Sequence, residues 1–467
     1  MKKINIIVFV VFALIAFVGG LNHEPWADEA QSWIIARDAN VAQIIWDVSR
    51  YEGTFPLWFL TIKLFINFGL QYEYFFIIPI IISCIGLLVF LKSVDAPKFV
   101  KILLPFTYYV LYQFTIVARS YSYLFLALSI WASLYKDRMN KKVKYALSLA
   151  FLSMISMHGM IISGVLGLIF IIDLIKNKDY KNAIIPTIVL IVTWIIECVV
   201  LFPRTDLYMN VALIHSFKAV LNSILATVFT GGNIVEKIYI AIGVIVFLIL
   251  IGLELKLKNK DCLITTISLI AFMAVIRLVQ HHLGIIAMFI MFATLVNYEE
   301  LRTKYKHFEK LFIIMLGVYI SFSVFAVIND FNANYSGAKQ MAIYIEENNI
   351  DEKEIYRFGY KNVSLIPYFE NNIYSNTDKT IYEWKQSNKD FYEYVNFNKE
   401  SIKESHKDVP EYILVEFDEK NSKVKEINEL INETGCYELE YQTIGKQYYK
   451  CTYVDTESFN LYRLKNK

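Results

Sequence analysis

The chain has 467 residues, of which 56% are hydrophobic, 16% aromatic and only 19% charged, and its mean hydropathy is +0.41. A soluble protein is about 45–50% apolar and about 25% charged, so this composition excludes an ordinary soluble enzyme and a disordered chain. Five cysteines exclude a disulfide scaffold, and a net charge of +2 without a basic face excludes a nucleic-acid-binding protein.

Charge divides the chain into two regions. Residues 1–328 carry 28 Lys and Arg against 19 Asp and Glu, whereas residues 329–467 carry 18 against 25. The long apolar stretches all lie in the first region. The sequence therefore predicts an α-helical polytopic membrane domain over residues 1–328, followed by a small soluble domain over residues 329–467.

A helix that crosses the bilayer needs about 20 mostly apolar residues, and about eleven segments of the first region come close to this. They are residues 4–21, 73–91, 102–118, 120–135, 145–157, 160–175, 183–201, 235–254, 262–278, 283–298 and 311–328. A secretory signal is the alternative for residues 1–21. No Ala-x-Ala-like cleavage site follows them, which favours a retained first helix.

The distribution of Lys and Arg over the connections orients these helices. Alternate connections, counted from the N-terminus, carry 20 Lys and Arg, and the connections between them carry 8. This predicts a multi-pass protein of the cell membrane with a cytoplasmic N-terminus and an extracytoplasmic C-terminal domain. Residues 55–68 are apolar too, but a crossing there would turn the Lys-rich connections outward. We therefore expect an interfacial helix inside a long external loop of residues 22–72, and a second such helix at 217–229.

The first external loop contains an acidic pair, Asp28-Glu29, at the start of a segment with the periodicity of an amphipathic helix. One interpretation is that Asp28 caps this helix and Glu29 favours its dipole. The loop is also rich in Trp and lies against the membrane, where a desolvated carboxylate can serve as a general base. The local sequence alone is compatible with both interpretations.

Further polar residues lie near the expected external ends of spans. Glu52 is either a loop carboxylate without a special partner or a second acid or metal ligand, because divalent cations accept oxygen ligands. Arg119 and Arg277 suit a phosphate group, with snorkelling at the interface as the alternative.

Three histidines occupy similar positions, namely His158, His281 and His282. His281 and His282 are neighbours, so on one helix they point about 100° apart and at most one is expected to enter a site. No GxGxxG, P-loop, HExxH or CxxC pattern is present. A reaction on the outer face has no ATP to draw on, so its energy must come from an activated substrate or a gradient.

These residues resemble those of the membrane-embedded GT-C glycosyltransferases, in particular the bacterial family-39-type branch similar to protein O-mannosyltransferases and lipid A aminoarabinose transferases. The resemblance rests on Asp28-Glu29, on Glu52-Gly53 with Pro56-Leu57 before the interfacial helix, on Arg119, and on the external C-terminal domain. It implies a GT-C-like fold and a membrane glycosyltransferase. Such an enzyme moves a sugar, usually with inversion, from a polyprenyl-phosphate-linked donor to a glycan, lipid or protein acceptor on the outer face.

The resemblance also implies roles for individual residues. Asp28 would be the catalytic base with Glu29 in support, Glu52 would lie near the donor phosphate or a divalent metal ion, and Arg119 would bind phosphate. Relatives often carry another Asp shortly after this Arg, whereas Ser120 follows here, so a mechanism with two Asp is not expected. The alternatives are a transporter or flippase of lipid-linked saccharides without catalytic activity, and an assembly partner that binds through its tail. A transporter predicts internal repeats, and we find none in the sequence.

The tail carries strand-like runs at 411–417 and 436–454 and a helical pattern over 338–348, which predicts a small α/β domain above the loop site. Cys436 and Cys451 flank an expected hairpin turn near residues 443–444. They either form a disulfide, which the external location permits, or remain buried thiols.

The topology leads to a labelling prediction. In a background without native cysteines, a cysteine at residue 40 should react with a membrane-impermeant thiol reagent in intact cells, because the first loop is external. A cysteine at residue 140 lies in a Lys-rich connection and should react only after the cells are lysed. The reverse pattern would contradict the orientation.

Overall fold

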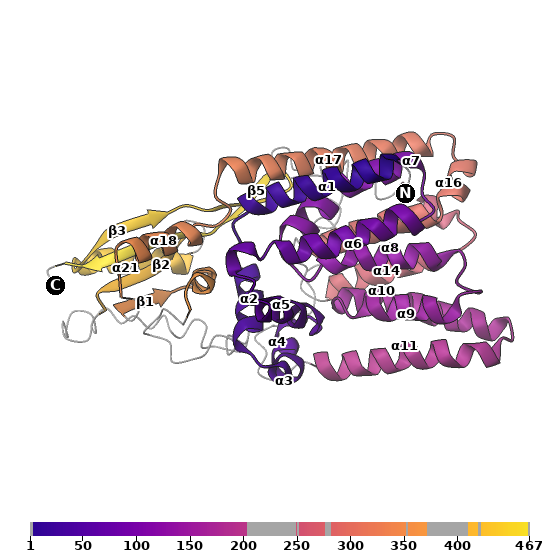
Figure 1. The fold of residues 1–467 in the computed structure, drawn as a ribbon, viewed down its shortest axis with the longest axis horizontal. Helices are drawn as coiled ribbons and strands as arrows, with labels where there is room; N and C mark the ends of the chain where they lie inside the picture. The colour runs from indigo at the N-terminus through magenta and orange to yellow at the C-terminus, as the bar shows by residue number, and fades with distance from the viewer. Residues whose placement is uncertain are drawn as a thin grey trace.

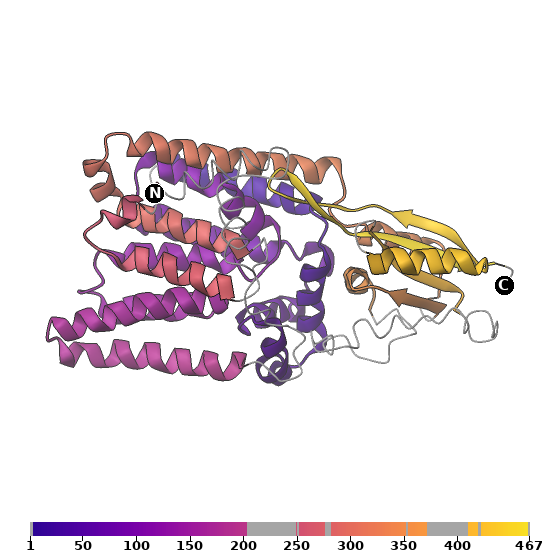
Figure 2. The same ribbon diagram turned by 180° about the vertical axis from the view of Figure 1, so that it is seen from behind.

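The computed structural model describes residues 3–202, 249, 252–275, 282–351, 354–370, 410–418 and 422–465. A bundle of helices makes up most of it, and a smaller domain with a sheet projects beyond one end of the bundle (Figures 1 and 2). Short helices of the first loop lie between the two parts. The N-terminus lies at the far end of the bundle and the C-terminus at the tip of the sheet domain.

The bundle contains helices in ten of the eleven segments predicted as spans. They are α1 (Lys3–Asn22), α6 (Ile77–Ser93), α7 (Lys98–Leu103) with η3 (Leu104–Phe106) and η4 (Tyr108–Ile116), α8 (Ser122–Tyr135), α9 (Lys142–Ser153), α10 (Met157–Lys176), α11 (Tyr180–Leu201), α14 (Asp261–Val275), α15 (Leu283–Val296) and α17 (Phe308–Asn332), with α16 (Tyr298–Lys304) joining the last two. The remaining predicted span, 235–254, and the predicted interfacial helix at 217–229 lie almost wholly outside the described residues.

Among the described residues, five helices are long and apolar enough to cross a membrane, or up to seven if each of two bent pairs is one span. The bends measure 43° between Lys98–Phe106 and Tyr108–Ile116, and 71° between Leu283–Val296 and Tyr298–Lys304. This agrees with the expectation of a membrane protein. The count of eleven spans stays a prediction, because several helices such as α8 and α9 are shorter than about 20 residues.

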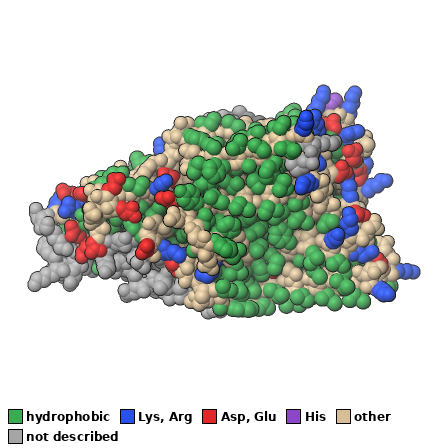
Figure 3. All heavy atoms as spheres, in the orientation of Figure 1, with side chains coloured by type: hydrophobic (Ala, Val, Ile, Leu, Met, Phe, Trp, Pro, Cys, Tyr) green, Lys and Arg blue, Asp and Glu red, His purple; other side chains and the backbone are tan. Residues whose placement is uncertain are grey.

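The face of the bundle seen in Figure 3 is a broad apolar band. Lys and Arg side chains gather at the end of the bundle away from the sheet domain, and the band between is nearly free of charge. Helix α11 shows the reason, since one row of its large side chains is exposed: Ile184, Ile185, Ile188, Ile191, Val192, Ile195 and Ile196. Apolar residues this exposed on a folded chain are typical of helices that face lipid.

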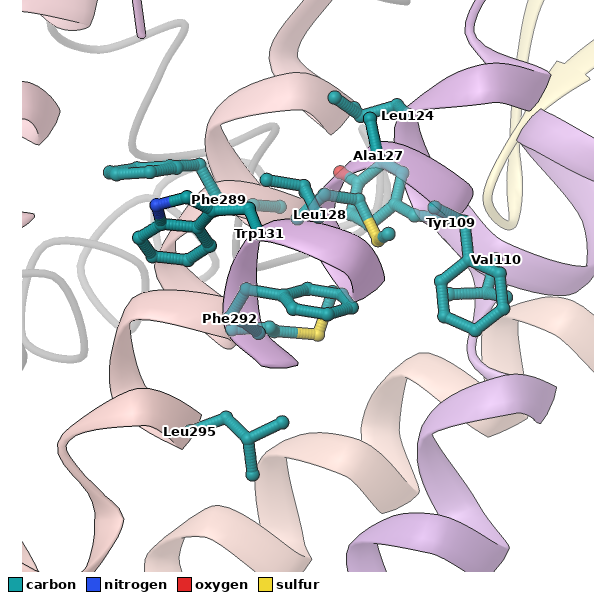
Figure 4. Packing of buried hydrophobic residues seen from close by; sticks show 14 of the residues in the cluster. Tyr109, Val110, Leu124, Ala127, Leu128, Trp131, Phe289, Phe292 and Leu295 are labelled. Carbon is teal, nitrogen blue, oxygen red and sulfur yellow. The ribbon is translucent and has the colours of Figure 1, made fainter. Parts of the chain in front are cut away.

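Helix α15 lies at the centre of the bundle. All fourteen of its residues are buried, as expected for a helix that is apolar on every side. Phe289 and Phe292 pack there against Trp131 and Leu128 of α8 (Figure 4). A Cβ on Gly284 would lie 2.7 Å from the Tyr109 ring, so only glycine allows η4 to approach α15 this closely.

The first loop forms a layer of short helices: α2 (Ala27–Asp38), α3 (Val41–Gln43), the π-helical turn η1 (Ile44–Val48), α4 (Ser49–Glu52), α5 (Leu57–Asn67) and the 3₁₀ turn η2 (Tyr72–Tyr74). With 11 residues, α5 is too short to cross a bilayer, and it packs against α2 instead. Lys63 of α5 donates hydrogen bonds to the carbonyl oxygens of Ala36 and Ala39, at 3.1 and 2.8 Å. These bonds satisfy acceptors at the C-terminal end of α2 and fix its direction.

The sheet domain confirms the predicted helix near 338–348 and the strand over 411–417. It consists of α18 (Ala338–Glu347), β1 (Ile355–Phe358), η8 (Lys361–Ser364), η9 (Ile366–Tyr368), β2 (Tyr412–Phe417), α21 (Ser422–Thr434), β3 (Tyr437–Thr443), β4 (Lys446–Tyr449), β5 (Thr452–Thr456) and β6 (Ser458–Leu464). Four strands form a sheet in the order β1-β2-β6-β3, in which only β1 and β2 are parallel. Alternate residues face opposite helices, so that Leu414 packs with α18 and Ile413 with α21.

The β4–β5 hairpin leaves the sheet and inserts its tip into the bundle, beside α17 (Figures 1 and 2). The Tyr449 hydroxyl lies 2.9 Å from that of Tyr109 in η4. Lys450 at the tip is fully buried, and its Nζ lies 5.3–5.7 Å from the ring centres of Tyr109, Tyr319, Phe322 and Tyr449. Four aromatic rings thus surround the Lys450 amine, whose pKa burial lowers well below its usual range, and this packing attaches the sheet domain to the bundle.

The hairpin decides the state of the two cysteines. Cys436 and Cys451 are free thiols, so the predicted disulfide between them is wrong, and both thiols are half-buried where the alternative expected them to be buried. We expected the turn near residues 443–444, but β3 pairs with β6, and the hairpin turns at Lys450-Cys451 between β4 and β5. Cys436 precedes β3 at the sheet, whereas Cys451 follows the buried tip.

The hairpin contact gives a stability prediction. Tyr449→Phe removes the hydroxyl that meets Tyr109 and should lower the free energy of unfolding by about 1 kcal/mol, the usual net value of such a hydrogen bond. Thermal unfolding in detergent measures the change. Tyr448→Phe is the matched control, since the Tyr448 ring contacts Phe325 and Tyr453 but its hydroxyl makes no hydrogen bond within the described part of the chain. Equal effects of both variants would contradict the anchoring role.

Candidate functional site

Asp28 lies in the first turn of α2, the helix that follows α1 and lies between the bundle and the sheet domain (Figure 1). It is the second residue of the helix and not its cap, so the capping interpretation is wrong. The Asp28 carboxylate forms an ion pair with the Arg119 guanidinium through Oδ2. Both side chains keep some contact with solvent, 26% for Asp28 and 18% for Arg119.

Arg119 follows η4, a nine-residue π-helical segment. π-Helical turns are rare and frequently lie at functional sites, and here the segment ends at Ile116, three residues before Arg119. The guanidinium lies 5.6 Å from the Trp26 ring and 6.0 Å from the Tyr121 ring. These aromatic rings, together with Asp28, hold the cation at the end of the bundle that faces the sheet domain.

Glu29 is buried directly beside this pair, with 1% of its surface exposed. Oε1 accepts a hydrogen bond from the backbone N–H of Ala118 at 2.5 Å, and Oε2 accepts one from the backbone N–H of Trp26 at 3.2 Å. His23 lies 3.1 Å from Oε2. Glu29 therefore joins the start of α2 to the residue before Arg119, and so it fixes Asp28 and Arg119 relative to each other.

His23 extends this network into the bundle. Its Nδ1 lies 2.9 Å from Oδ2 of Asp330 near the end of α17, and the Tyr112 hydroxyl donates to the same carboxylate at 3.0 Å. Burial by itself lowers the pKa of His23, but Glu29 and Asp330 on its two sides outweigh burial and raise the pKa to about 10. The imidazole is thus a buried cation between two carboxylates.

Glu52 closes the other side of the site. Gly53, in a left-handed conformation with φ of 59°, ends α4 directly after Glu52. The Glu52 carboxylate accepts a hydrogen bond from the side-chain amide of Gln31 in α2 at 3.3 Å. Burial is the main cause that raises the pKa of Glu52 to about 7, and Asp28 adds to it against the opposing effect of Arg119. Glu52, Asp28 and Arg119 therefore act on one another electrostatically, as their sequence positions led us to expect.

The structure also brings His158 and His282 together. The centres of their two rings are 4.5 Å apart, and the centre of the Tyr121 ring lies 6.0 Å from that of the His282 ring. His158 is buried at the start of α10, where its Nδ1 has no hydrogen-bond partner among the described residues. Tyr121 thus connects the histidine pair to Arg119. Arg277 and His281 lie outside the described residues.

A divalent metal ion was part of the sequence hypothesis. Within the described part of the chain, no group of three or more His, Cys, Asp or Glu side chains is arranged to hold a metal ion. Asp28 pairs with Arg119, and Glu29 pairs with His23. Glu52 lies within the electrostatic reach of both Arg119 and Asp28. The described side chains therefore do not fit a metal centre.

The sheet domain contributes two residues that sequence reasoning missed. The Tyr360 hydroxyl donates to Oδ1 of Asp28 at 3.4 Å. Glu457 accepts a hydrogen bond from the backbone N–H of Ala27, the first residue of α2, at 3.1 Å. Asp330 and His23 also escaped assignment, although an ionisable residue at the end of a span is a signal that could have found Asp330.

Comparison of the chain with protein families, with curated proteins and with solved structures finds no match. The functional argument therefore depends on the site alone.

The His23 network leads to a pH prediction. The pKa of His23 is about 10 in the folded chain and about 6.5 when unfolded. Protonation then stabilises the fold, fully below about pH 6.5, and the stabilisation is lost as the pH rises through 10. His23→Gln leaves two buried carboxylates without their cation and should cost about 3 kcal/mol at pH 6, with a smaller cost at pH 10.

Thermal unfolding in detergent at both pH values measures this difference. His307→Gln, at an exposed position, is the control and should change little. A cost of His23→Gln that is the same at both pH values would contradict the charged state of His23.

Proposed function

We propose that the chain is an integral membrane glycosyltransferase that transfers a sugar from a polyprenyl-phosphate-linked donor to a hydroxyl group of a glycan, lipid or protein acceptor on the outer face of the cell membrane. The observation that carries the proposal is the ion pair of Asp28 and Arg119. A carboxylate and a guanidinium that are partly accessible, yet fixed by a buried network, supply a base and a phosphate-binding cation in one place.

The transfer needs both groups at once. The acceptor oxygen attacks the anomeric carbon, the bond from this carbon to the phosphate oxygen breaks, and its electron pair leaves with the phosphate. Asp28 receives the proton of the acceptor hydroxyl, and Arg119 offsets the charge on the departing phosphate. Attack from the side opposite the phosphate inverts the anomeric centre. The donor is already activated, so no nucleotide is required.

The ion pair also provides an order of events. Without donor, Asp28 and Arg119 neutralise each other. A phosphate competes for the guanidinium, which it can bind through two parallel hydrogen bonds, and this frees the Asp28 carboxylate for the acceptor. Glu52, with a pKa of about 7, carries a proton in a large share of molecules near neutral pH and can then donate to a phosphate oxygen without repelling it.

Two further features agree with a lipid-linked donor. His158, His282 and Tyr121 continue from Arg119 into the bundle, so a phosphate held at Arg119 meets further polar groups at the membrane end of the site. The apolar band of the bundle suits the polyprenyl chain and membrane lipids (Figure 3). The basic end of the bundle lies away from the site, which fits a cytoplasmic N-terminus and an extracytoplasmic sheet domain.

The decisive variant is Asp28→Asn. It keeps the size of the side chain and removes the base, so sugar transfer should fall by about 10²- to 10⁴-fold, the usual contribution of a general base. Mass spectrometry of cell-surface glycans, with and without the protein, identifies the product, and transfer by the purified protein gives the rate. Asp38→Asn is the control, because Asp38 lies at the other end of α2, is exposed and pairs with Arg37.

Full transfer activity of Asp28→Asn at normal protein levels would refute the assignment of the base. Unchanged surface glycans in cells without the protein, together with altered movement of lipid-linked saccharides, would favour a transporter instead.

A further inference from the structure

Tyr360 lies in a tightly held loop between β1 and η8 of the sheet domain. Gly359 before it has φ of 108°, and a Cβ at this position would lie 2.6 Å from Oε1 of Glu416. The backbone N–H of Lys361 donates to that same Glu416 carboxylate, and Lys361 Nζ lies 2.8 Å from Asp455. The loop conformation is therefore fixed from both sides of Tyr360.

The whole domain is also fixed against α2. Glu457 is fully buried and accepts hydrogen bonds from Ala27 N–H at 3.1 Å and from the Ser336 hydroxyl at 2.6 Å. Arg37, near the other end of α2, donates to the Phe369 carbonyl oxygen at 2.9 Å. Ala27 and Ile34 of α2 belong to one apolar core with Leu414 and residues of α18. The domain and the helix that carries Asp28 thus behave as one packed unit.

The Asp28 carboxylate is divided between two neighbours. Oδ2 pairs with Arg119, which belongs to the bundle, and Oδ1 accepts the hydrogen bond from Tyr360, which belongs to the sheet domain. Burial, with the nearby Asp28 charge as a second cause, raises the pKa of Tyr360 well above 10, so its hydroxyl remains a donor. A donor phosphate that draws Arg119 away would leave the Tyr360 hydroxyl in place.

We propose that Tyr360 is a positioning residue for Asp28, and that the C-terminal domain thereby completes the catalytic centre. The inference rests on the proposed function. Tyr360 orients the carboxylate while Arg119 binds phosphate, and its hydrogen bond favours the charged form that accepts a proton. Oδ2, the Asp28 oxygen that Arg119 releases to the phosphate, then accepts the proton of the acceptor hydroxyl, while Tyr360 holds Oδ1.

Tyr360→Phe tests the inference, because it removes the hydroxyl and keeps the ring. We expect kcat to fall about 10- to 100-fold, which corresponds to the loss of one hydrogen bond to a charged group, with an unchanged KM for the donor. The acidic limb of the pH–rate profile should also move to higher pH, because the carboxylate loses a bond that favours its charged form. A purely structural defect would not move this limb.

Tyr344→Phe is the matched control, since the Tyr344 hydroxyl donates to Glu440 at 3.2 Å within the same domain but away from Asp28. It should leave kcat and the pH profile unchanged. Wild type and Asp28→Asn are measured alongside. An active wild type, an inactive Asp28→Asn and an unaltered Tyr360→Phe would overturn the inference and leave the proposed function standing. A wild type without transfer activity would refute both.

Discussion

The arrangement of the site depends on one buried carboxylate. Glu29 is almost inaccessible to solvent and accepts hydrogen bonds from Ala118 N–H and Trp26 N–H, while His23 lies against its second oxygen. A charge buried in this way is costly unless every oxygen finds a partner. Here the partners come from the connection between α1 and α2 and from the segment after η4, so satisfying Glu29 brings two distant parts of the chain to one point. Asp28 and Arg119, the neighbours of Glu29 and Ala118 in the chain, meet as a consequence.

The need to satisfy buried polar groups also explains the connection between the two domains. The N-terminus of α2 has unpaired N–H groups that its cap residue Trp26 does not satisfy. Glu29 satisfies one of them from within the first turn, and Glu457 satisfies another from 430 residues away. The hairpin adds a second attachment, in which aromatic rings surround the buried amine of Lys450 inside the bundle. With two attachments at different places, the sheet domain has a defined orientation over the site.

Much of the architecture could be predicted because it depends on local patterns. Apolar length predicted the helices of the bundle, a strand-like run predicted β2, and the helical periodicity after Asp28-Glu29 predicted α2. The charge count assigned residues 55–68 to a short helix, and α5 has only 11 residues. Predictions of which strands or cysteines pair with each other were less successful. The disulfide failed because residues 436–454 contain three strands, and the sequence did not show that β3 pairs with the later strand β6 and not with β4.

The sequence by itself determined that this is a protein of apolar helices with a separate acidic domain, and that Asp28, Glu29, Glu52 and Arg119 lie in connections between its hydrophobic segments. Their positions next to hydrophobic segments carry that information. Only the tertiary structure decided which of them touch, that Asp28 pairs with Arg119 and not with its own helix terminus, and that His23, Asp330, Tyr360 and Glu457 belong with them. These contacts span from 6 to 430 residues of sequence, and burial enforces them because each unpaired charge would be costly. No local pattern encodes such a requirement.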